Sequence, residues 1–285
     1  MFRALESSRP TGSRLFQDDL AQLFVHRWHR WLYNFARFDA GRRVVEHLFD
    51  REVPGARAAG IARTRWIDDR AVEALKTVPQ LVLLGAGYDT RAYRLTAAGQ
   101  AAVFELDRPE MLLAKQAALE KAIGSLPQHV RFAAIDFNRR SIGEVLSQAG
   151  FNGQHTACFI WEGVTNYLSA EAADGALRQI GKAAAGSVLL FTYIDRAVLE
   201  TPARFHGAEK LLSRLRAYGE PWTFGIDPAE LAGYLGVRGL RLTEDLSVAE
   251  VWRQAGRPLS QVRGYEFYRL ASACLDRSGG RHGSV

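Results

Sequence analysis

Four short apolar runs in the first two thirds of the chain each end in a glycine or a carboxylate. They are 81–84 before Gly85-Ala86-Gly87, 101–106 before Asp107, 129–135 before Asp136, and 156–161 before Glu162. Apolar runs of this length, separated by helical stretches, are typical of buried parallel strands. Ligands of open α/β sheets bind beyond the carboxyl ends of such strands. The pattern therefore predicts a ligand site where these glycines and acids meet.

The glycine turn between residues 85 and 87 is the first part of this site. Gly85 and Gly87 let the backbone turn sharply and let a ligand approach without meeting a Cβ atom. The helical segment that follows presents free N–H groups. Thr90 stands where nicotinamide and flavin sites have a third glycine, and no Gly-Lys-Ser/Thr follows. The turn, with Ala86 at its centre, is thus expected to hold a ligand without a pyrophosphate.

The acids that follow the next two runs have the chemistry of an adenosine site. Asp107 comes 22 residues after Gly85, where a carboxylate accepts hydrogen bonds from both ribose hydroxyls. Glu105 lies two residues earlier and is predicted to point to the same side of the strand. Asp136 can accept from the exocyclic amino group of adenine, and the backbone N–H of Phe137 can donate to a ring nitrogen.

The motifs LGAGYDTRAYRL, FELDRP, AIDF and WEGVTNYL, in this order, resemble the leucine carboxyl methyltransferase family of S-adenosylmethionine (SAM) enzymes. ARTRWIDD resembles the arginine-containing helix that precedes the first strand in that family. The resemblance covers roughly residues 63–195. It implies SAM as the cofactor and a class I SAM methyltransferase fold. This is a Rossmann-like α/β fold with a mostly parallel seven-stranded sheet, helices on both faces, N-terminal helices and a lid insertion.

The resemblance also suggests how the methionine part of SAM is bound. It places Arg63 opposite the glycine turn, where a guanidinium can grip the SAM carboxylate. Arg14, in an N-terminal segment that closes over the cofactor, is a second candidate for that carboxylate. Glu162 and Gly163 are expected near the SAM amino group or the sulfonium.

The sequence allows two interpretations for a pair of arginines near these motifs and one for a pair of acids. Arg91 and Arg94 flank the helix after the glycine turn and either bind an anionic acceptor or pair on the helix surface. Asp68 and Asp69 are interpreted as surface or capping acids.

Three residues are candidates for the acceptor side: Tyr167, Tyr193 and His206. No histidine lies in the strand-end motifs, and a carboxylate acceptor needs no general base whereas a phenol benefits from one. The expected function is methyl transfer from SAM to an oxygen, a carboxylate, of a small anionic molecule. Two alternatives stay open, a NAD(P)-dependent oxidoreductase and a non-catalytic module that binds an adenosine ligand. No catalytic base is assigned.

Composition restricts the class of protein further. The 285 residues are 47% hydrophobic, but no apolar stretch is long enough to span a membrane, so no membrane partner is expected. The formal charge of +6 includes no run of five basic residues, so no nucleic-acid partner is expected. His26 and His29 lack a third ligand nearby, so no metal is expected. Two cysteines and the lack of a signal core indicate a cytoplasmic protein without a disulfide framework. The oligomeric state is left open.

The chain divides into three predicted parts. Residues 1–60 form an N-terminal arm, flexible over 1–14, and a helical cap. Residues 61–275 form the SAM-binding domain, with a lid at about 196–226, and residues 276–285 form a flexible tail. The remaining strands are predicted over 187–194, 240–242 and 265–270, with a helix over 248–254.

Overall fold

The structure is a computed structural model that describes residues 1–276. The tail predicted over 276–285 therefore lies, beyond Asp276, outside the described residues. Asp276 itself is exposed.

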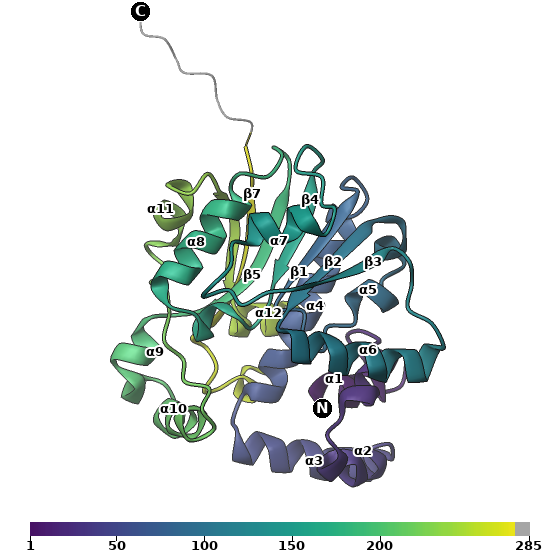
Figure 1. Cartoon of the computed structure of the whole chain (residues 1–285). Coiled ribbons are helices and arrows are strands. Elements are labelled where there is room, and N and C mark those ends of the chain that lie inside the picture. Colours follow the sequence, from purple (N-terminus) through teal and green to yellow (C-terminus); the bar gives the residue numbers. More distant parts are fainter. Residues whose placement is uncertain (277–285) are drawn as a thin grey trace, which may run out of the picture.

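One mixed sheet of seven strands forms the centre of the molecule (Figure 1). Its order is β3-β2-β1-β4-β5-β7-β6. The strands are β1 (Gln80–Leu84), β2 (Ala102–Asp107), β3 (Val130–Ala134), β4 (Ala157–Trp161), β5 (Val188–Ile194), β6 (Arg241–Ser247) and β7 (Tyr268–Cys274). The first five pair in parallel, and β7 is antiparallel to both β5 and β6. The predicted α/β fold class is confirmed.

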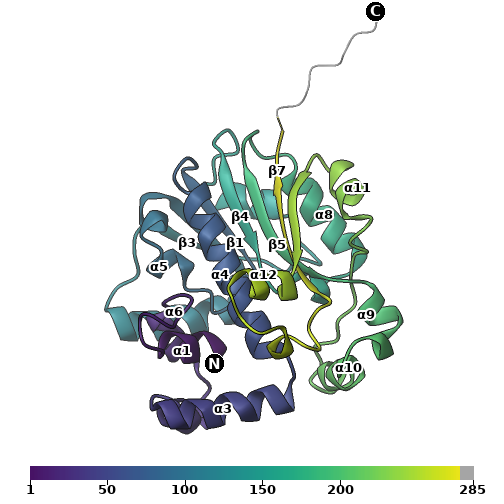
Figure 2. The same cartoon turned by 180° about the vertical axis from the view of Figure 1, so that it is seen from behind.

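Alternating side chains of the strands feed two hydrophobic layers, one on each face of the sheet. Leu81 and Leu83 belong to one layer, and Val82 and Leu84 belong to the other. The first layer packs against α4 (Ala56–Ala74) and α12 (Val248–Gln254). The second packs against α7 (Ile142–Gln148), α8 (Ala170–Ile180) and α11 (Leu231–Gly236). Figures 1 and 2 show these two sets of helices on opposite sides of the strands.

The N-terminal region is more ordered than its composition indicates. It contains α1 (Phe2–Ser7), η1 (Asp19–Phe24), η2 (Arg27–His29), α2 (Arg30–Phe35) and α3 (Asp39–Glu52). The flexible arm predicted over 1–14 is wrong over α1, because this helix packs on α4 and buries Ala4 and Leu5. A helix of six residues has too little length to be stable alone, so only its tertiary packing specifies it.

The last two strands begin and end later than predicted. The predictions over 240–242 and 265–270 correspond to β6 and β7, which extend to Ser247 and Cys274. The edge strand β6 carries Glu244 and Asp245, which pair with Arg70 at 2.6 Å and Arg269 at 2.8 Å. These acids interrupt the apolar pattern, and their partners come from other elements. The helix predicted over 248–254 is confirmed as α12.

The segment predicted as a lid leaves the sheet after β5 and returns before α11. It contains α9 (Ala197–Glu200), η5 (Pro202–Arg204) and α10 (Ala208–Ala217). A parallel bridge between Asp195 and Ile226 holds its two ends together. Its movement as a lid stays a prediction. The remaining elements are α5 (Arg91–Arg94), η3 (Thr96–Gln100), α6 (Pro109–Ile123), η4 (Thr165–Tyr167) and η6 (Leu259–Gln261).

A buried ion pair joins β2 to α6 beneath the glycine turn. Lys115 Nζ lies 2.7 Å from Glu105 Oε2, and both side chains are fully buried. The same ammonium lies 3.5 Å from the carbonyl oxygen of Ala86. Because both charges have left water, each depends on the other for compensation.

We predict that Glu105→Gln lowers the free energy of unfolding by about 3 kcal/mol, because it leaves the ammonium of Lys115 buried without a counter-charge. Urea unfolding of the wild-type and variant chains measures this. The double variant Glu105→Leu/Lys115→Met removes both charges and should recover most of the loss. Equal destabilisation by the single and double variants would show that packing, rather than charge pairing, is what the site contributes.

Candidate functional site

Two adjoining cavities lie beyond the carboxyl ends of β1 to β4. Their volumes are about 310 and 670 Å³, and both are lined by Gly85, Tyr88 and Gly163. We call them the first and the second cavity. Volumes of about 300–1,000 Å³ are usual for small-molecule sites. The strand-end residues predicted to meet at one edge of the sheet are therefore brought together, with the exception of Glu105, which is described below.

The glycine turn has the conformation that its sequence indicates. Gly85 and Gly87 have φ values of +69° and +38°, in a region that favours glycine. A Cβ atom on Gly85 would lie 2.4 Å from Val164 Cγ2. Gly163, after β4, also has a positive φ of +70°. The loops after β1 and β4 can thus approach each other closely, and Ala86 lines the first cavity beside them.

The second cavity contains the acids predicted for adenosine. The carboxylate of Asp107 accepts hydrogen bonds from the backbone N–H groups of Gly87 at 2.6 Å and Arg108 at 2.7 Å. These bonds fix the carboxylate and leave it with further acceptor capacity. Asp136 and Phe137 line the same cavity. Asp136 Oδ1 accepts from the backbone N–H of Asn138 at 3.0 Å, which orients it at the loop after β3.

The first cavity contains opposite charges at short distance. Arg63 Nε donates to Glu162 Oε1 at 2.9 Å, and its guanidinium lies 5.1 Å from the centre of the Tyr268 ring. Arg91 Nη1 donates to the other oxygen of Glu162 at 2.7 Å. Burial opposes ionisation of Glu162, but Arg91 and Arg63 outweigh it and hold its pKa below the usual value. Glu162 is therefore a carboxylate at neutral pH.

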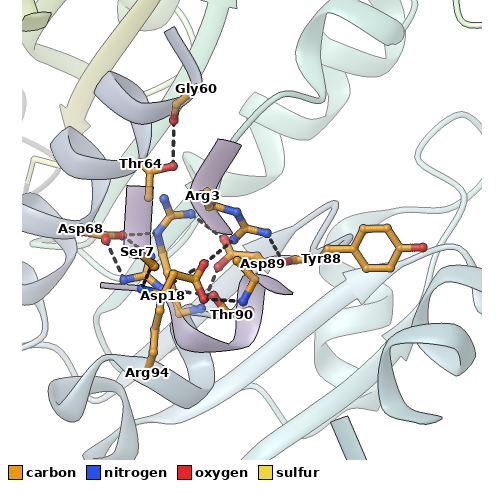
Figure 3. A network of polar contacts seen from close by, with 12 residues as sticks. Arg3, Ser7, Asp18, Gly60, Thr64, Asp68, Tyr88, Asp89, Thr90 and Arg94 are labelled. Atoms are coloured by element: carbon orange, nitrogen blue, oxygen red, sulfur yellow. Dashed lines mark hydrogen bonds and ion pairs between the residues drawn. The ribbon is translucent and has the colours of Figure 1, made fainter. Parts of the chain in front are cut away.

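Arg91 is almost fully buried and binds three carboxylates. Besides Glu162, it contacts Asp68 at 2.7 Å and Asp89 at 2.6 Å. Burial opposes the charge of Asp89, but Arg91 above all holds the pKa of Asp89 well below its usual range. Arg94 binds both oxygens of Asp68, at 2.7 and 2.8 Å (Figure 3). We call Arg91, Arg94 and these three acids the arginine network.

The arginine network decides between the two interpretations of its members. Neither Arg91 nor Arg94 lines either cavity, so neither faces an acceptor. Both pair with acids as the second interpretation predicted, but in the interior and not on the helix surface. The interpretation of Asp68 as a surface or capping acid is wrong, because Asp68 is buried against both arginines. The contact could not be predicted from the sequence, because Asp68 lies on α4 and the two arginines lie on α5.

The N-terminal helix contributes a cation that the sequence did not identify. Arg3 lines the first cavity, lies 3.2 Å from Asp18 and donates to the backbone carbonyl of Tyr88 (Figure 3). Arg14, which the resemblance suggested for the SAM carboxylate, lines neither cavity and donates to Gln17 instead. No local pattern distinguishes Arg3, because its position depends on how α1 packs.

Glu105 is the second predicted cofactor residue that the structure does not bring to a cavity. It lies on the side of β2 that faces Lys115 and is sealed from both cavities. Burial raises the pKa of Glu105 to about 7, and the adjacent ammonium of Lys115 opposes that rise.

Only one of the three acceptor-side candidates reaches the cavities. Tyr167 lines the second cavity. Tyr193 is buried, donates to Asp245 at 2.9 Å and accepts from Arg269 at 3.0 Å. His206 lines a separate cavity of about 240 Å³.

An aromatic group beside Tyr167 was missed by the sequence analysis. The Tyr167 ring lies 6.5 Å from Trp222, which lies 6.3 Å from Tyr268. Thr192 bonds this group to the strand ends: its hydroxyl accepts from the backbone N–H of Gly163 at 2.8 Å and lies 3.3 Å from the hydroxyl of Tyr268. Successive side chains of β5 point to opposite faces of the sheet, so Thr192 faces the aromatic group and Tyr193 faces away from it.

The fold is that of class I SAM methyltransferases, as two solved structures show. A candidate methyltransferase from Thermobifida fusca superposes with a TM-score of 0.60 at 20% identity, covering 96% of this chain and 97% of that one. The 1,6-didemethyltoxoflavin-N1-methyltransferase from Burkholderia thailandensis, solved with that substrate and S-adenosylhomocysteine, gives 0.50 at 14% identity. That match covers 84% of this chain and 90% of the other. Identities this low concern the fold alone.

Sequence comparison identifies the family. The leucine carboxyl methyltransferase pattern matches residues 1–181. A candidate SAM-dependent methyltransferase from Mycolicibacterium smegmatis is 35% identical over 182 residues, 62% of this chain and 57% of that protein. Another, from Mycolicibacterium paratuberculosis, is 34% identical over 244 residues, 80% of this chain and 73% of the relative. The chain belongs to the leucine carboxyl methyltransferase family, whose cofactor is SAM, and the oxidoreductase alternative is not retained.

Replacing Gly85 by alanine should be far more costly than replacing Gly124. Both have positive φ, but a Cβ atom on Gly124 would meet no atom within 4 Å, whereas one on Gly85 meets Val164. Gly124→Ala therefore adds only backbone strain, and Gly85→Ala adds a clash as well. We expect Gly85→Ala to lower the free energy of unfolding by about 2 kcal/mol more than Gly124→Ala. Denaturant titrations measure the difference, and equal losses would mean that the two loops have room to separate.

Asp107→Asn should weaken S-adenosylhomocysteine binding by about tenfold to a hundredfold, because hydrogen bonds to a charged group contribute about 1.5–3 kcal/mol. Calorimetric titration gives the dissociation constants. Asp69→Asn is the matched control, since Asp69 pairs with Arg65 on the outer surface and lines neither cavity. An unchanged affinity in Asp107→Asn would exclude Asp107 from the ribose site.

Proposed function

We propose that the protein is a SAM-dependent O-methyltransferase that methylates a carboxylate of a small, anionic acceptor. The main support is the distribution of charge across the adjoining cavities. The first cavity presents Arg63 and Glu162, which suit the carboxylate and ammonium groups of an amino acid. The second presents Asp107 and Asp136, which suit ribose and adenine. The order of these charges fits the two ends of SAM.

The chemistry of the residues present fits this cofactor. Arg63 keeps guanidinium N–H groups beyond the one that binds Glu162, and Arg3 lies at the same cavity. Both can bind the SAM carboxylate. Glu162 stays ionised through Arg91 and can accept from the ammonium group. SAM, when bound, supplies a methyl group already activated by the positive sulfur, so the protein has to orient the acceptor and exclude water.

The acceptor side supports a substrate that needs no deprotonation. Neither cavity is lined by histidine or lysine among residues 1–276. Burial raises the pKa of Tyr268, and burial raises the pKa of Tyr265 also. Both phenols therefore stay protonated at neutral pH, neither lines the first or the second cavity, and they do not serve as bases. A carboxylate is already ionised at neutral pH and needs no base.

The predicted cytoplasmic location belongs to the same proposal. Cys158 and Cys274 are both free thiols. Burial raises the pKa of the Cys158 thiol to about 12, which keeps it unreactive. Unpaired cysteines are typical of a reducing compartment.

Methyl transfer to a panel of carboxylic acids and phenols, with isotope-labelled SAM, tests the proposal. We expect labelled methyl esters, which alkali hydrolyses, and no labelled phenyl ethers. Methylation of phenols alone would overturn the carboxylate assignment. Binding of SAM without turnover of any acceptor in the panel would favour a non-catalytic module.

The pH dependence of kcat/KM provides an independent prediction. A carboxylate acceptor loses its proton near pH 4–5, so ionisation of the acceptor should add no slope to the rate between about pH 6 and 9. Glu162 and Asp89 do not change this, since their pKa values are lowered and both stay ionised over that range. A phenol acceptor without a base would instead give a rate that rises towards its pKa near 10. A slope of this kind would contradict the carboxylate proposal.

A further inference from the structure

An exposed surface that is both apolar and basic lies on η2, α2 and α3, and none of its residues lines the first or the second cavity. We call it the outer hairpin surface. Its large apolar members are all exposed: Trp28, Trp31, Phe35, Phe38, Val44 and Leu48. Trp28 and Phe38 keep 73% and 72% of their surface in contact with solvent. In Figures 1 and 2 the helix α3 forms one outer edge of the molecule, with α2 beside it in Figure 1.

The large apolar residues belong to three consecutive elements. Trp31 and Phe35 lie four residues apart on α2 and therefore on one face of it, whereas Trp28 lies in η2 and Phe38 is the extended residue that precedes α3. On α3, Val44 and Leu48 lie one turn apart, while Gly41 and Val45 are buried on the inner side. Monomeric proteins seldom expose contiguous apolar patches of this kind unless they contact a partner.

The charges on this hairpin leave a net positive surface. Its acids are all paired within the protein: Asp39 with Arg42, Glu46 with Arg9 and Arg57, Asp50 with Arg57, and Glu52 with Arg214. Five arginines of the same segment are exposed and form no ion pair with any of residues 1–276: Arg27, Arg30, Arg37, Arg43 and Arg51. A partner for this surface must therefore be anionic as well as apolar.

We propose that the outer hairpin surface docks on the surface of an anionic lipid bilayer. Basic amphipathic helices with tryptophan, phenylalanine and leucine on one side lie in the plane of a bilayer interface. Tryptophan rings favour the level of the headgroups, and arginines bind anionic headgroups. Among residues 1–276, none of the helices has the length and apolar character needed to cross a bilayer. The sequence analysis expected no membrane partner on that ground, but peripheral docking requires no crossing.

Two other occupants fit the same surface less well. A second copy of this chain, related by a two-fold axis, would place the unpaired arginines of both copies against each other. A nucleic acid would match the arginines and could stack on the aromatic rings. It offers nothing for Val44 and Leu48, which lack a π face. An anionic bilayer satisfies both the aliphatic and the charged members.

The docking surface lies close to the first cavity. The ring of Phe49, on α3, packs edge-on against the ring of Phe2 at 5.4 Å. Phe2 lines the first cavity. A bilayer at the outer hairpin surface is thus separated from the cavity wall by α3 and a single aromatic contact.

Flotation with lipid vesicles tests this proposal on the full chain. We expect the protein to float with vesicles of equal parts phosphatidylcholine and phosphatidylglycerol, and not with phosphatidylcholine alone. Binding should weaken as salt is added. The variant Arg30→Glu/Arg37→Glu/Arg43→Glu should lower the partition coefficient about a hundredfold or more, since each basic residue near an anionic surface contributes roughly fivefold. Trp28→Ala/Trp31→Ala should lower it as well.

A matched control changes the same number of charges elsewhere. Arg204→Glu/Arg216→Glu/Arg253→Glu alters exposed arginines that form no ion pair with the described residues and lie outside the hairpin, and it should retain most of the binding. Equal losses in the two triple variants would show that only the overall charge matters and would overturn the proposal. Failure to float with the anionic vesicles, or binding to a DNA oligonucleotide that the hairpin variants abolish, would overturn it too. The salt series on wild-type protein does not depend on how any variant folds.

Discussion

The buried guanidinium of Arg91 is the constraint on which the site depends. A charge this far from water is costly unless it is fully paired, and Arg91 meets three carboxylates at 2.6–2.7 Å. These acids come from α4, from the loop that follows the glycine turn and from the residue after β4, which are otherwise separate pieces of chain. Displacing any one of them would leave the guanidinium partly unpaired. The arginine network therefore fixes the walls of the first cavity relative to one another, as a preorganised site requires.

The arginine network also connects the cavities to the N-terminal helices. Asp18 approaches Arg94 at 3.7 Å and Arg3 at 3.2 Å, so α1 is held beside the glycine turn by charge as well as by packing. Phe2 then continues the contact to α3. A segment that composition alone marks as a flexible arm is in this way a wall of the candidate cofactor site, and it lies between that site and the outer hairpin surface.

Local features could be predicted from the sequence, whereas partners distant in sequence could not. The first five strands, the positive-φ glycines and the edge position of Asp107 and Asp136 follow from apolar runs and from the rule for parallel sheets. The burial of Glu105 depends on its ion pair with Lys115, which lies on the next helix. The burial of Asp68 depends on Arg91, 23 residues away. Tyr193 failed as a candidate because one residue of strand alternation decides which face it joins. The position of Arg3 at the first cavity depends on how the six-residue helix α1 packs against the rest of the protein.

A crystal structure of the chain with S-adenosylhomocysteine would test the central claim most directly. We expect the homocysteine carboxylate at Arg63 and Arg3, its amino group at Glu162, the ribose on Asp107 and the adenine between Asp136 and Phe137. Glu162 should keep its bond to Arg91, because the network is already formed without the ligand. A ligand bound outside the two cavities, or one that separates Glu162 from Arg91, would contradict the idea that the buried arginine presets the site.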